Sequence, residues 1–246
     1  MARNTNRKKT LTYYFSVEGS TEKWYLDWLE NQINSLDEAK CKVKIKAEVQ
    51  KDPVSYGKKL TVREKTIVWH ISDIEGTSRE HIQAVEGTLT RLKDVKKLGK
   101  DIVYKWGYSN LSFHLWMILH KQNCNAALAG VNNYLSHINN AFGAQFESMK
   151  KYKEEANFKR CLEQLQLEDV VTAILRAKTI MQRNERDGYP LTRFKGYAYY
   201  LHNPSLELWQ PIEQILNDCG IIRMDYPENR KIAEELDFSC SSALLI

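Results

Sequence analysis

The sequence predicts an α/β protein in which a mostly parallel sheet flanked by helices is followed by a helical C-terminal half. Three observations support this prediction. In the first half of the chain, short runs rich in β-branched and aromatic residues alternate with helical runs, as they do in βα units. From about residue 110 the helical periodicity continues without a comparable strand. The 246 residues are 43% apolar, which is enough to form an ordinary core.

Four strands are expected in the first half, and each has the composition of a strand that packs on at least one face. They are TYYFSV (12–17), CKVKIKAEV (41–49), KTIVWHIS (65–72) and DIVYKWG (101–107). The second alternates apolar and polar residues, as a strand at the edge of a sheet does.

Helical runs lie between these strands and beyond them. Those of the first half cover 21–33, 53–63 and 78–99. Those of the second half cover 111–121, 126–142, 154–165, 167–187 and 206–220. We therefore expect three parts, namely a disordered basic arm (1–10), an α/β core (11–110) and a helical part packed on that core (111–246).

The composition excludes several classes of protein. The 36 basic residues face 31 acidic ones, so the net charge of +5 permits a polyanionic partner without requiring one. Five scattered cysteines without a CxxC pair argue against a disulfide framework and against a zinc site. No apolar stretch approaches the roughly 20 residues of a membrane-spanning helix, and no secretory core follows the basic start. We expect a soluble, cytoplasmic protein.

Two of the expected strands end in carboxylates. The first is followed by VEGSTE (17–22), which places Glu18 on a glycine corner and Glu22 one helical turn later. The third runs into SDIEG (72–76), where Asp73 and Glu75 are two residues apart and so project to one face. Ligands of open α/β sheets bind outside the carboxyl ends of the strands. Because neighbouring strands lie about 4.8 Å apart, Glu18 can reach the other two acids if the first and third strands are neighbours or nearly so.

Converging carboxylates repel one another and raise each other's pKa, and a divalent cation compensates for this. Hard oxygen ligands suit Mg²⁺ or Mn²⁺, which can polarise a phosphoryl oxygen and activate a water. The pattern therefore indicates phosphodiester cleavage or phosphoryl transfer. The alternative is that these acids cap helices, which for Glu22, in the first turn of a helix, is as well supported as a metal role.

The order of these motifs resembles that of a Toprim domain, and within Toprim proteins it resembles the RloB-like family of bacterial restriction and phage-defence loci. A strand leads to an E-G-x-x-E corner, a later strand ends in D-x-E, and another reaches an S-N-x-x-F segment before a helix. The matching segments span most of the chain and are VEGSTEKWYLDWL (17–29), HISDIEG (70–76), YSNLSFHLWMILHK (108–121), KKYKEEANF (150–158) and VVTAILRAK (170–178).

The resemblance implies a Toprim-like core with Glu18 as general acid or base, Asp73 and Glu75 as Mg²⁺ ligands, and Glu22 assisting with a metal. The chain departs from the family pattern at Leu111, where the family has proline, and at His114, where it has glutamate. A histidine at this position can contact a phosphate, and the alternative is that it packs in the core.

The resemblance also places the basic segment around residue 150 near the active site, where the amine of Lys153 can steady a scissile phosphate. The further candidates for nucleic-acid contacts are Lys150, Lys151, Arg176 and Lys178. Their alternative is a solvated helix surface. The aromatic stretch RFKGYAYYLHNP (193–204) can stack on nucleic acid or can form an edge strand or packed loop.

The resemblance implies a Mg²⁺- or Mn²⁺-dependent Toprim nuclease that acts on DNA or tRNA-like RNA as the effector of an anti-phage defence system. The chain has no P-loop, so the ABC-type or AAA-type ATPase that accompanies such effectors must be a separate protein. Two alternatives remain, a nucleotidyl-transfer enzyme and a non-catalytic scaffold with a degenerate Toprim fold. A homo-oligomer is compatible with the sequence, which does not decide the oligomeric state.

Overall fold

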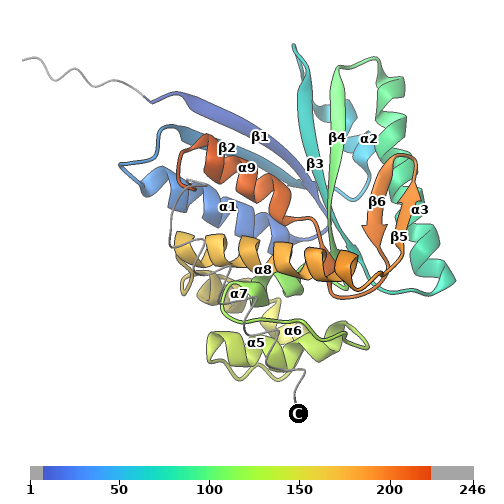
Figure 1. Cartoon of the computed structure of the whole chain (residues 1–246). Coiled ribbons are helices and arrows are strands. Elements are labelled where there is room, and N and C mark those ends of the chain that lie inside the picture. The colour runs from blue at the N-terminus through green and yellow to red at the C-terminus, as the bar shows by residue number, and fades with distance from the viewer. Residues whose placement is uncertain (1–7, 223–246) are drawn as a thin grey trace, which may run out of the picture.

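A five-stranded sheet forms the centre of the protein in the computed structural model, which describes residues 8–222. The strand order is β2–β1–β3–β4–β7, with the first four strands parallel and β7 antiparallel to β4 (Figure 1). The bounds are β1 Thr10–Val17, β2 Lys42–Val49, β3 Thr66–Ile74, β4 Ile102–Asn110 and β7 Ser205–Leu206.

The sheet is covered on both faces, and alternate residues of β3 show this directly. Trp69 and Ile71 belong to one hydrophobic cluster, whereas Val68 and Ile74 belong to another. The first cluster is shared with α1 (Ser20–Ser35) and with helices of the second half, and the second with α2 and α3. The bounds of these last two are α2 Pro53–Lys59 and α3 Arg79–Asp94, and a 3-10 helix, η1 (Val95–Leu98), follows α3.

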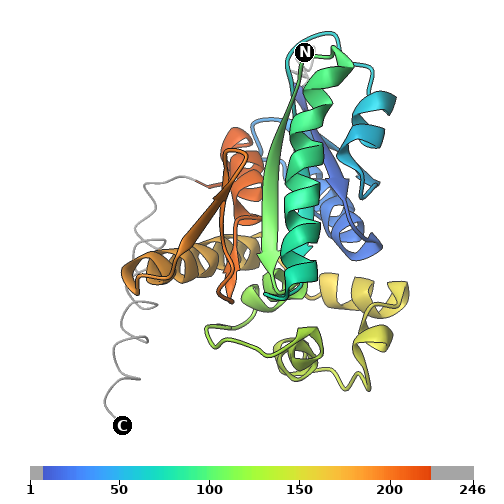
Figure 2. The same ribbon diagram turned by 90° about the vertical axis from the view of Figure 1, so that its right-hand side faces the viewer.

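The second half contributes most of the remaining helices. Figure 2 shows the yellow-green and yellow helices, α5 to α7, beyond the end of the sheet at which β4 finishes. The bounds are α4 His114–Leu119, η2 Val131–Asn133, α5 Tyr134–Phe142, α6 Met149–Tyr152, α7 Glu155–Leu162, α8 Leu167–Arg186 and α9 Trp209–Asp218. No helix among residues 8–222 is long and apolar enough to cross a membrane.

The expected α/β architecture is confirmed, including the place of the second strand at the sheet edge. The largely helical second half also contains short strands, and an edge strand was the alternative given for residues 193–204. A hairpin forms from β5 (Leu191–Phe194) and β6 (Tyr197–Tyr200), and β7 joins the sheet beside β4. The hairpin turn uses positive φ values at Lys195 (48°) and Gly196 (81°), the conformation of a two-residue type I′ turn.

The start of the fold also differs from the expected boundary of the basic arm. Thr10 already belongs to β1, and the backbone of Lys9 accepts a hydrogen bond from Lys42 N–H at 2.9 Å. Residues 1–7 of the predicted arm lie outside the described residues, as do residues 223–246 of the predicted helical part. Four cysteines, Cys41, Cys124, Cys161 and Cys219, are buried free thiols, as expected, and Cys240 lies outside the described residues.

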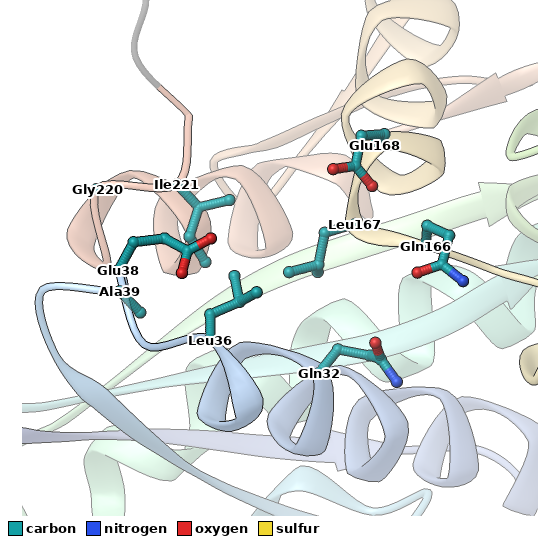
Figure 3. A pocket seen from close by; sticks show the side chains of 9 residues that line it. All are labelled: Gln32, Leu36, Glu38, Ala39, Gln166, Leu167, Glu168, Gly220 and Ile221. Atoms are coloured by element: carbon teal, nitrogen blue, oxygen red, sulfur yellow. The ribbon is translucent and has the colours of Figure 1, made fainter.

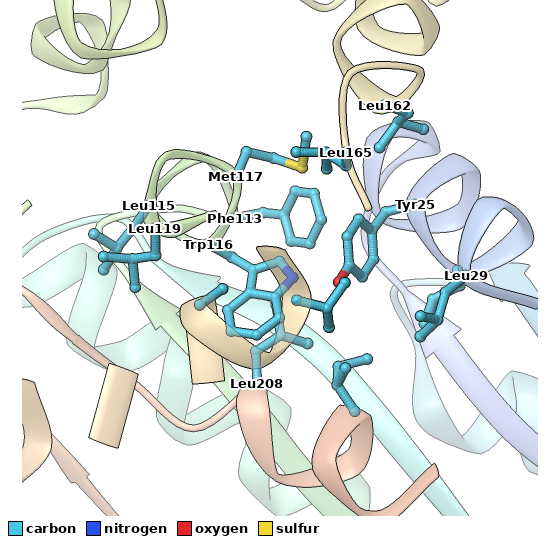
Figure 4. Packing of buried hydrophobic residues seen from close by; sticks show 14 of the residues in the cluster. Tyr25, Leu29, Phe113, Leu115, Trp116, Met117, Leu119, Leu162, Leu165 and Leu208 are labelled. Atoms are coloured by element: carbon cyan, nitrogen blue, oxygen red, sulfur yellow. The ribbon is translucent and has the colours of Figure 1, made fainter. Parts of the chain in front are cut away.

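The larger hydrophobic cluster joins α1, α4 and the sheet (Figure 4). Tyr25 of α1 is fully buried, and its ring meets Phe113 edge-on at a centroid distance of 5.8 Å and Trp116 at 6.1 Å. Phe113 directly precedes α4, so this packing fixes the start of that helix against α1. The consequence is that the segment after β4 is held rigidly beside the carboxyl end of the sheet.

Candidate functional site

Glu18 and Asp73 come together at the carboxyl edge of the sheet. β1 and β3 are neighbours, with Val17 in register with Ile71, so the residues just beyond them lie side by side. The backbone N–H of Asp73 donates a hydrogen bond to Glu18 Oε2 at 3.2 Å. The predicted acidic site required the first and third strands to be neighbours or nearly so, and β1 and β3 are neighbours.

Asp73 is also tied to the segment after β4. The backbone N–H of Phe113, the residue directly before α4, donates to Asp73 Oδ1 at 2.8 Å. Within residues 8–222 no hydrogen bond engages the other oxygen, Asp73 Oδ2. One carboxylate oxygen of Asp73 thus positions the chain, and the second is left for a ligand.

Glu22 approaches the same corner from the first turn of α1. Its side chain is only 4% exposed and accepts a hydrogen bond from Thr21 Oγ1 at 2.7 Å. A Cβ at position 19 would lie 3.0 Å from Glu22 Oε2, so Gly19 gives this carboxyl group room beside the corner.

Burial raises the pKa of Glu18, Glu22 and Asp73 above the usual carboxyl value. The charges of Glu22 and Glu18 raise the pKa of Asp73 further, and the charges of Glu22 and Glu75 do so for Glu18. The three carboxyl groups therefore repel one another electrostatically when they are ionised.

Glu75 stands at the rim of this corner. Its side chain is 67% exposed, and its Oε2 lies 3.9 Å from Nε2 of His81 in α3. A small pocket of 160 Å³ connects the rim to the acids and is lined by Glu18, Lys51, Ser72, Asp73, Glu75, His81, Ala84, Val85 and Thr88. Three of the four predicted carboxylates thus share one cavity, and the fourth, Glu22, lies behind it.

The motifs do not indicate Lys51 or His81, although both line the pocket. Lys51 follows the carboxyl end of β2, so the rule that indicated the acids, that ligands gather at strand ends, could also have indicated this lysine. His81 is the third residue of α3, and its N–H donates to the capping Ser78 Oγ at 3.4 Å. Nothing in the sequence distinguishes it from an ordinary surface histidine.

Two lysines supply positive charge to the acids. The charge of Lys153, directly after α6, lowers the pKa of Glu22 and of Asp73. Lys51 has the same effect on Glu18 and Glu22. Of the other predicted lysines, Lys150 is exposed and Lys151 pairs with Glu154 at 2.9 Å.

Three predicted nucleic-acid contacts have partners inside the protein and do not line the pocket. His114 is 2% exposed and packs edge-on against Tyr152, and burial lowers its pKa to about 3. Arg176 donates to the carbonyl of Leu119 at 2.6 Å, and Lys178 forms an ion pair with Glu213. His114 therefore has the alternative role stated for it, packing in the core. The aromatic stretch likewise packs, because β6 lies against Trp106 of β4.

A second pocket lies at the C-terminal end of α1, between the start of α8 and the end of α9 (Figure 3). Its side chains are mainly apolar or amide, with two carboxylates and no basic group. It is lined by Gln32, Leu36, Glu38, Ala39, Gln166, Leu167, Glu168, Gly220 and Ile221. Because it lacks charges of both signs converging on one point, we place the candidate site at the acidic corner.

The carboxylate oxygens at the acidic corner are ligands of the type that hard divalent cations prefer. Within residues 8–222 no three His, Cys, Asp or Glu side chains form a group that could hold a metal ion as they stand. Glu75, however, points to His81 from an exposed position, and Asp73 keeps an oxygen without a hydrogen bond. A cation would need a rotation of side chains and would relieve the repulsion that raises the carboxyl pKa values.

Comparison with known proteins gives one match. A family model described as RloB-like protein matches residues 13–215, a range that includes the acidic corner and both lysines. No curated protein and no solved structure matches the chain.

Proposed function

The chain belongs to the RloB-like family, and from this premise we propose that it is a metal-dependent, Toprim-type nuclease that cleaves phosphodiester bonds in DNA or tRNA-like RNA. The observation that carries the proposal is the meeting of Glu18 with Asp73 at the carboxyl edge of the sheet, between the charges of Lys51 and Lys153.

In this proposal Asp73 and Glu75 would hold Mg²⁺ or Mn²⁺, with Glu18 and Glu22 beside them. When bound, the cation would polarise a phosphoryl oxygen and lower the pKa of a water. Glu18 accepts a proton from the attacking water, a task that suits a carboxyl group whose pKa is raised by burial. Lys153 faces the phosphate with its positive charge, and the amide of Phe113 keeps Asp73 oriented.

The biological setting is proposed on the family premise alone. We place the protein in the cytoplasm as the effector of an anti-phage defence system, activated by a separate ABC-type or AAA-type ATPase, because the chain has no P-loop of its own.

The proposal is tested by incubating the purified chain with DNA and with tRNA. We expect cleavage of one polymer in the presence of Mg²⁺ or Mn²⁺, and complete loss of cleavage after chelation with EDTA. The partner ATPase and ATP are added in a parallel series. Cleavage that persists in EDTA would contradict the metal requirement, and intact polymers in every series would contradict the nuclease.

A non-catalytic scaffold is the second candidate, and it is favoured by the lack of a ready-made metal group within residues 8–222. Calorimetry with Mn²⁺ separates the two candidates. We expect the wild type to bind Mn²⁺ and Asp73→Asn to bind it at least about tenfold more weakly, because the amide keeps the bond from Phe113 N–H but removes the charge.

Asp94→Asn provides the matched control for this measurement. Asp94 ends α3, pairs with Lys97 at 2.7 Å and does not line the pocket, so its loss should leave Mn²⁺ binding unchanged. Equal Mn²⁺ affinity of the wild type and Asp73→Asn would favour the scaffold.

A further inference from the structure

Among residues 8–222, Lys51 is the one basic side chain that a parallel strand brings to the pocket. β1 leads to Glu18, β3 leads to Asp73, and β2 leads to Lys51, and all three residues line the same cavity. β2 is the edge strand of the sheet, and the side chain of Lys51 is exposed to solvent.

The backbone on both sides of Lys51 is anchored. The N–H of Gln50 donates to the carbonyl of Val17 at 2.9 Å, which holds the end of β2 beside the corner that carries Glu18. On the other side, Asp52 caps α2 by accepting from the N–H groups of Val54 and Ser55, each at 3.2 Å.

Asp52 is itself clamped by Arg91 of α3. Two guanidinium nitrogens donate to its two carboxylate oxygens at 2.9 and 2.7 Å, and Arg91 holds the pKa of Asp52 well below its usual range. This bidentate pair ties the loop to the helix that forms the pocket floor. The Cα of Lys51 is thus fixed, in contrast to Lys153, which follows a helix of only four residues.

The charge of Lys51 lowers the pKa of Glu18 and Glu22 without a direct ion pair. Among residues 8–222 no carboxylate lies within 4.0 Å of its amine, whereas the nearby Lys44 pairs with Glu30 and Lys59 pairs with Glu48. The side chain is exposed and lines the cavity. An ammonium group that extends from an anchored backbone, has no ion pair and lines the same small pocket as a set of carboxylates is suited to an anion that also contacts a cation between those carboxylates.

The lining of the pocket indicates which part of a nucleic acid it can receive. None of its nine lining residues is Phe, Tyr or Trp, the one ring among them is the imidazole of His81, which lies 3.9 Å from Glu75, and the volume of the pocket is 160 Å³. A lysine ammonium is a compact point charge without the rigid fork of arginine, and in nucleic-acid complexes most contacts of this kind are made to phosphate oxygens. We propose that Lys51 binds the backbone phosphate of the substrate at this pocket, without regard to base sequence, and this rests on the proposed function.

Salt dependence of binding tests this role directly. Each phosphate that a lysine neutralises contributes about 0.9 to the slope of log affinity against log salt for duplex DNA and about 0.7 for single strands. In the cleavage-deficient Glu18→Gln background, we expect Lys51→Gln to reduce the slope by these amounts. The affinity for single strands should fall about fivefold at 0.1 M salt, equally for strands of thymidine and of adenosine.

Lys58→Gln is the matched control, since Lys58 is an exposed lysine in α2 that does not line the pocket. It removes the same net charge and should change the slope only slightly. Lys51→Arg should keep the slope, and thermal unfolding of each variant checks that the fold is intact. A slope that Lys51→Gln leaves unchanged, or a loss that depends on the base, overturns the inference.

The failure of this inference and that of the proposed function give different results. If the wild type cuts nucleic acid in a metal-dependent way while Lys51→Gln keeps its slope, only the role of Lys51 is wrong. If the slope falls as expected but the wild type cuts neither polymer, only the nuclease activity is wrong. A chain that binds no nucleic acid contradicts both.

Discussion

Replacing Glu18 with glutamine is expected to lower the rate of metal-dependent cleavage by between about a hundredfold and ten-thousandfold, the usual contribution of a general acid or base. Glutamine has the same size and keeps an oxygen that accepts the N–H of Asp73. It can neither accept a proton from water nor offer a negative charge to a cation. The loss should therefore lie in the chemical step, with the geometry of the corner preserved.

The same substitution should leave the apo protein at least as stable as the wild type. Burial raises the pKa of Glu18, so its charged form is disfavoured in the folded state relative to the unfolded state. A neutral isostere removes that penalty at neutral pH. Single-turnover cleavage and thermal unfolding measured on one preparation would separate a catalytic loss from a folding defect.

Glu64→Gln is a suitable control, because Glu64 is exposed and lies two residues before β3, at the opposite end of that strand from Asp73. It should cleave at the wild-type rate. If Glu18→Gln also cleaves at that rate, Glu18 has no part in the mechanism, and the acids at the corner serve as helix caps.

The acidic corner could be predicted because it depends on local signals. Strand composition and period placed the ends of β1 and β3, and the rule for open α/β sheets placed Glu18 and Asp73 at one edge. Contacts between distant segments carry no such signal. The bond from Phe113 N–H to Asp73 joins residues 40 apart, and nothing near Phe113 in the sequence announces it.

The same limit explains the residues whose surroundings differ from expectation. His114 follows a strand end, as a ligand would, but its burial depends on Tyr152 of α6, a four-residue helix that periodicity cannot detect. β7 has two residues and exists because β4 pairs with it at Ser109 and Asn110. In each case tertiary packing, and not local propensity, decides the outcome.

Trp116→Ala is expected to lower the free energy of unfolding by about 3 to 5 kcal/mol, the range for removing a large aromatic side chain from a core. Trp116 is fully buried in α4, and its ring meets Tyr25 edge-on at 6.1 Å and His120 at 5.0 Å. Since whole domains are stable by only about 5 to 15 kcal/mol, the variant should unfold at a clearly lower urea concentration.

Trp116→Phe and Trp24→Ala make this measurement specific. Phenylalanine keeps most of the ring contact and should cost far less, and Trp24 is only partly buried, so its removal leaves a smaller cavity. A loss below about 1 kcal/mol in Trp116→Ala would mean that the surrounding side chains close the cavity.

Phe113 packs on Tyr25 in the same cluster and donates its N–H to Asp73. Because one residue takes part in both contacts, loosening this core should also reduce Mn²⁺ affinity at temperatures where the variant is still folded, whereas Trp24→Ala should leave that affinity unchanged.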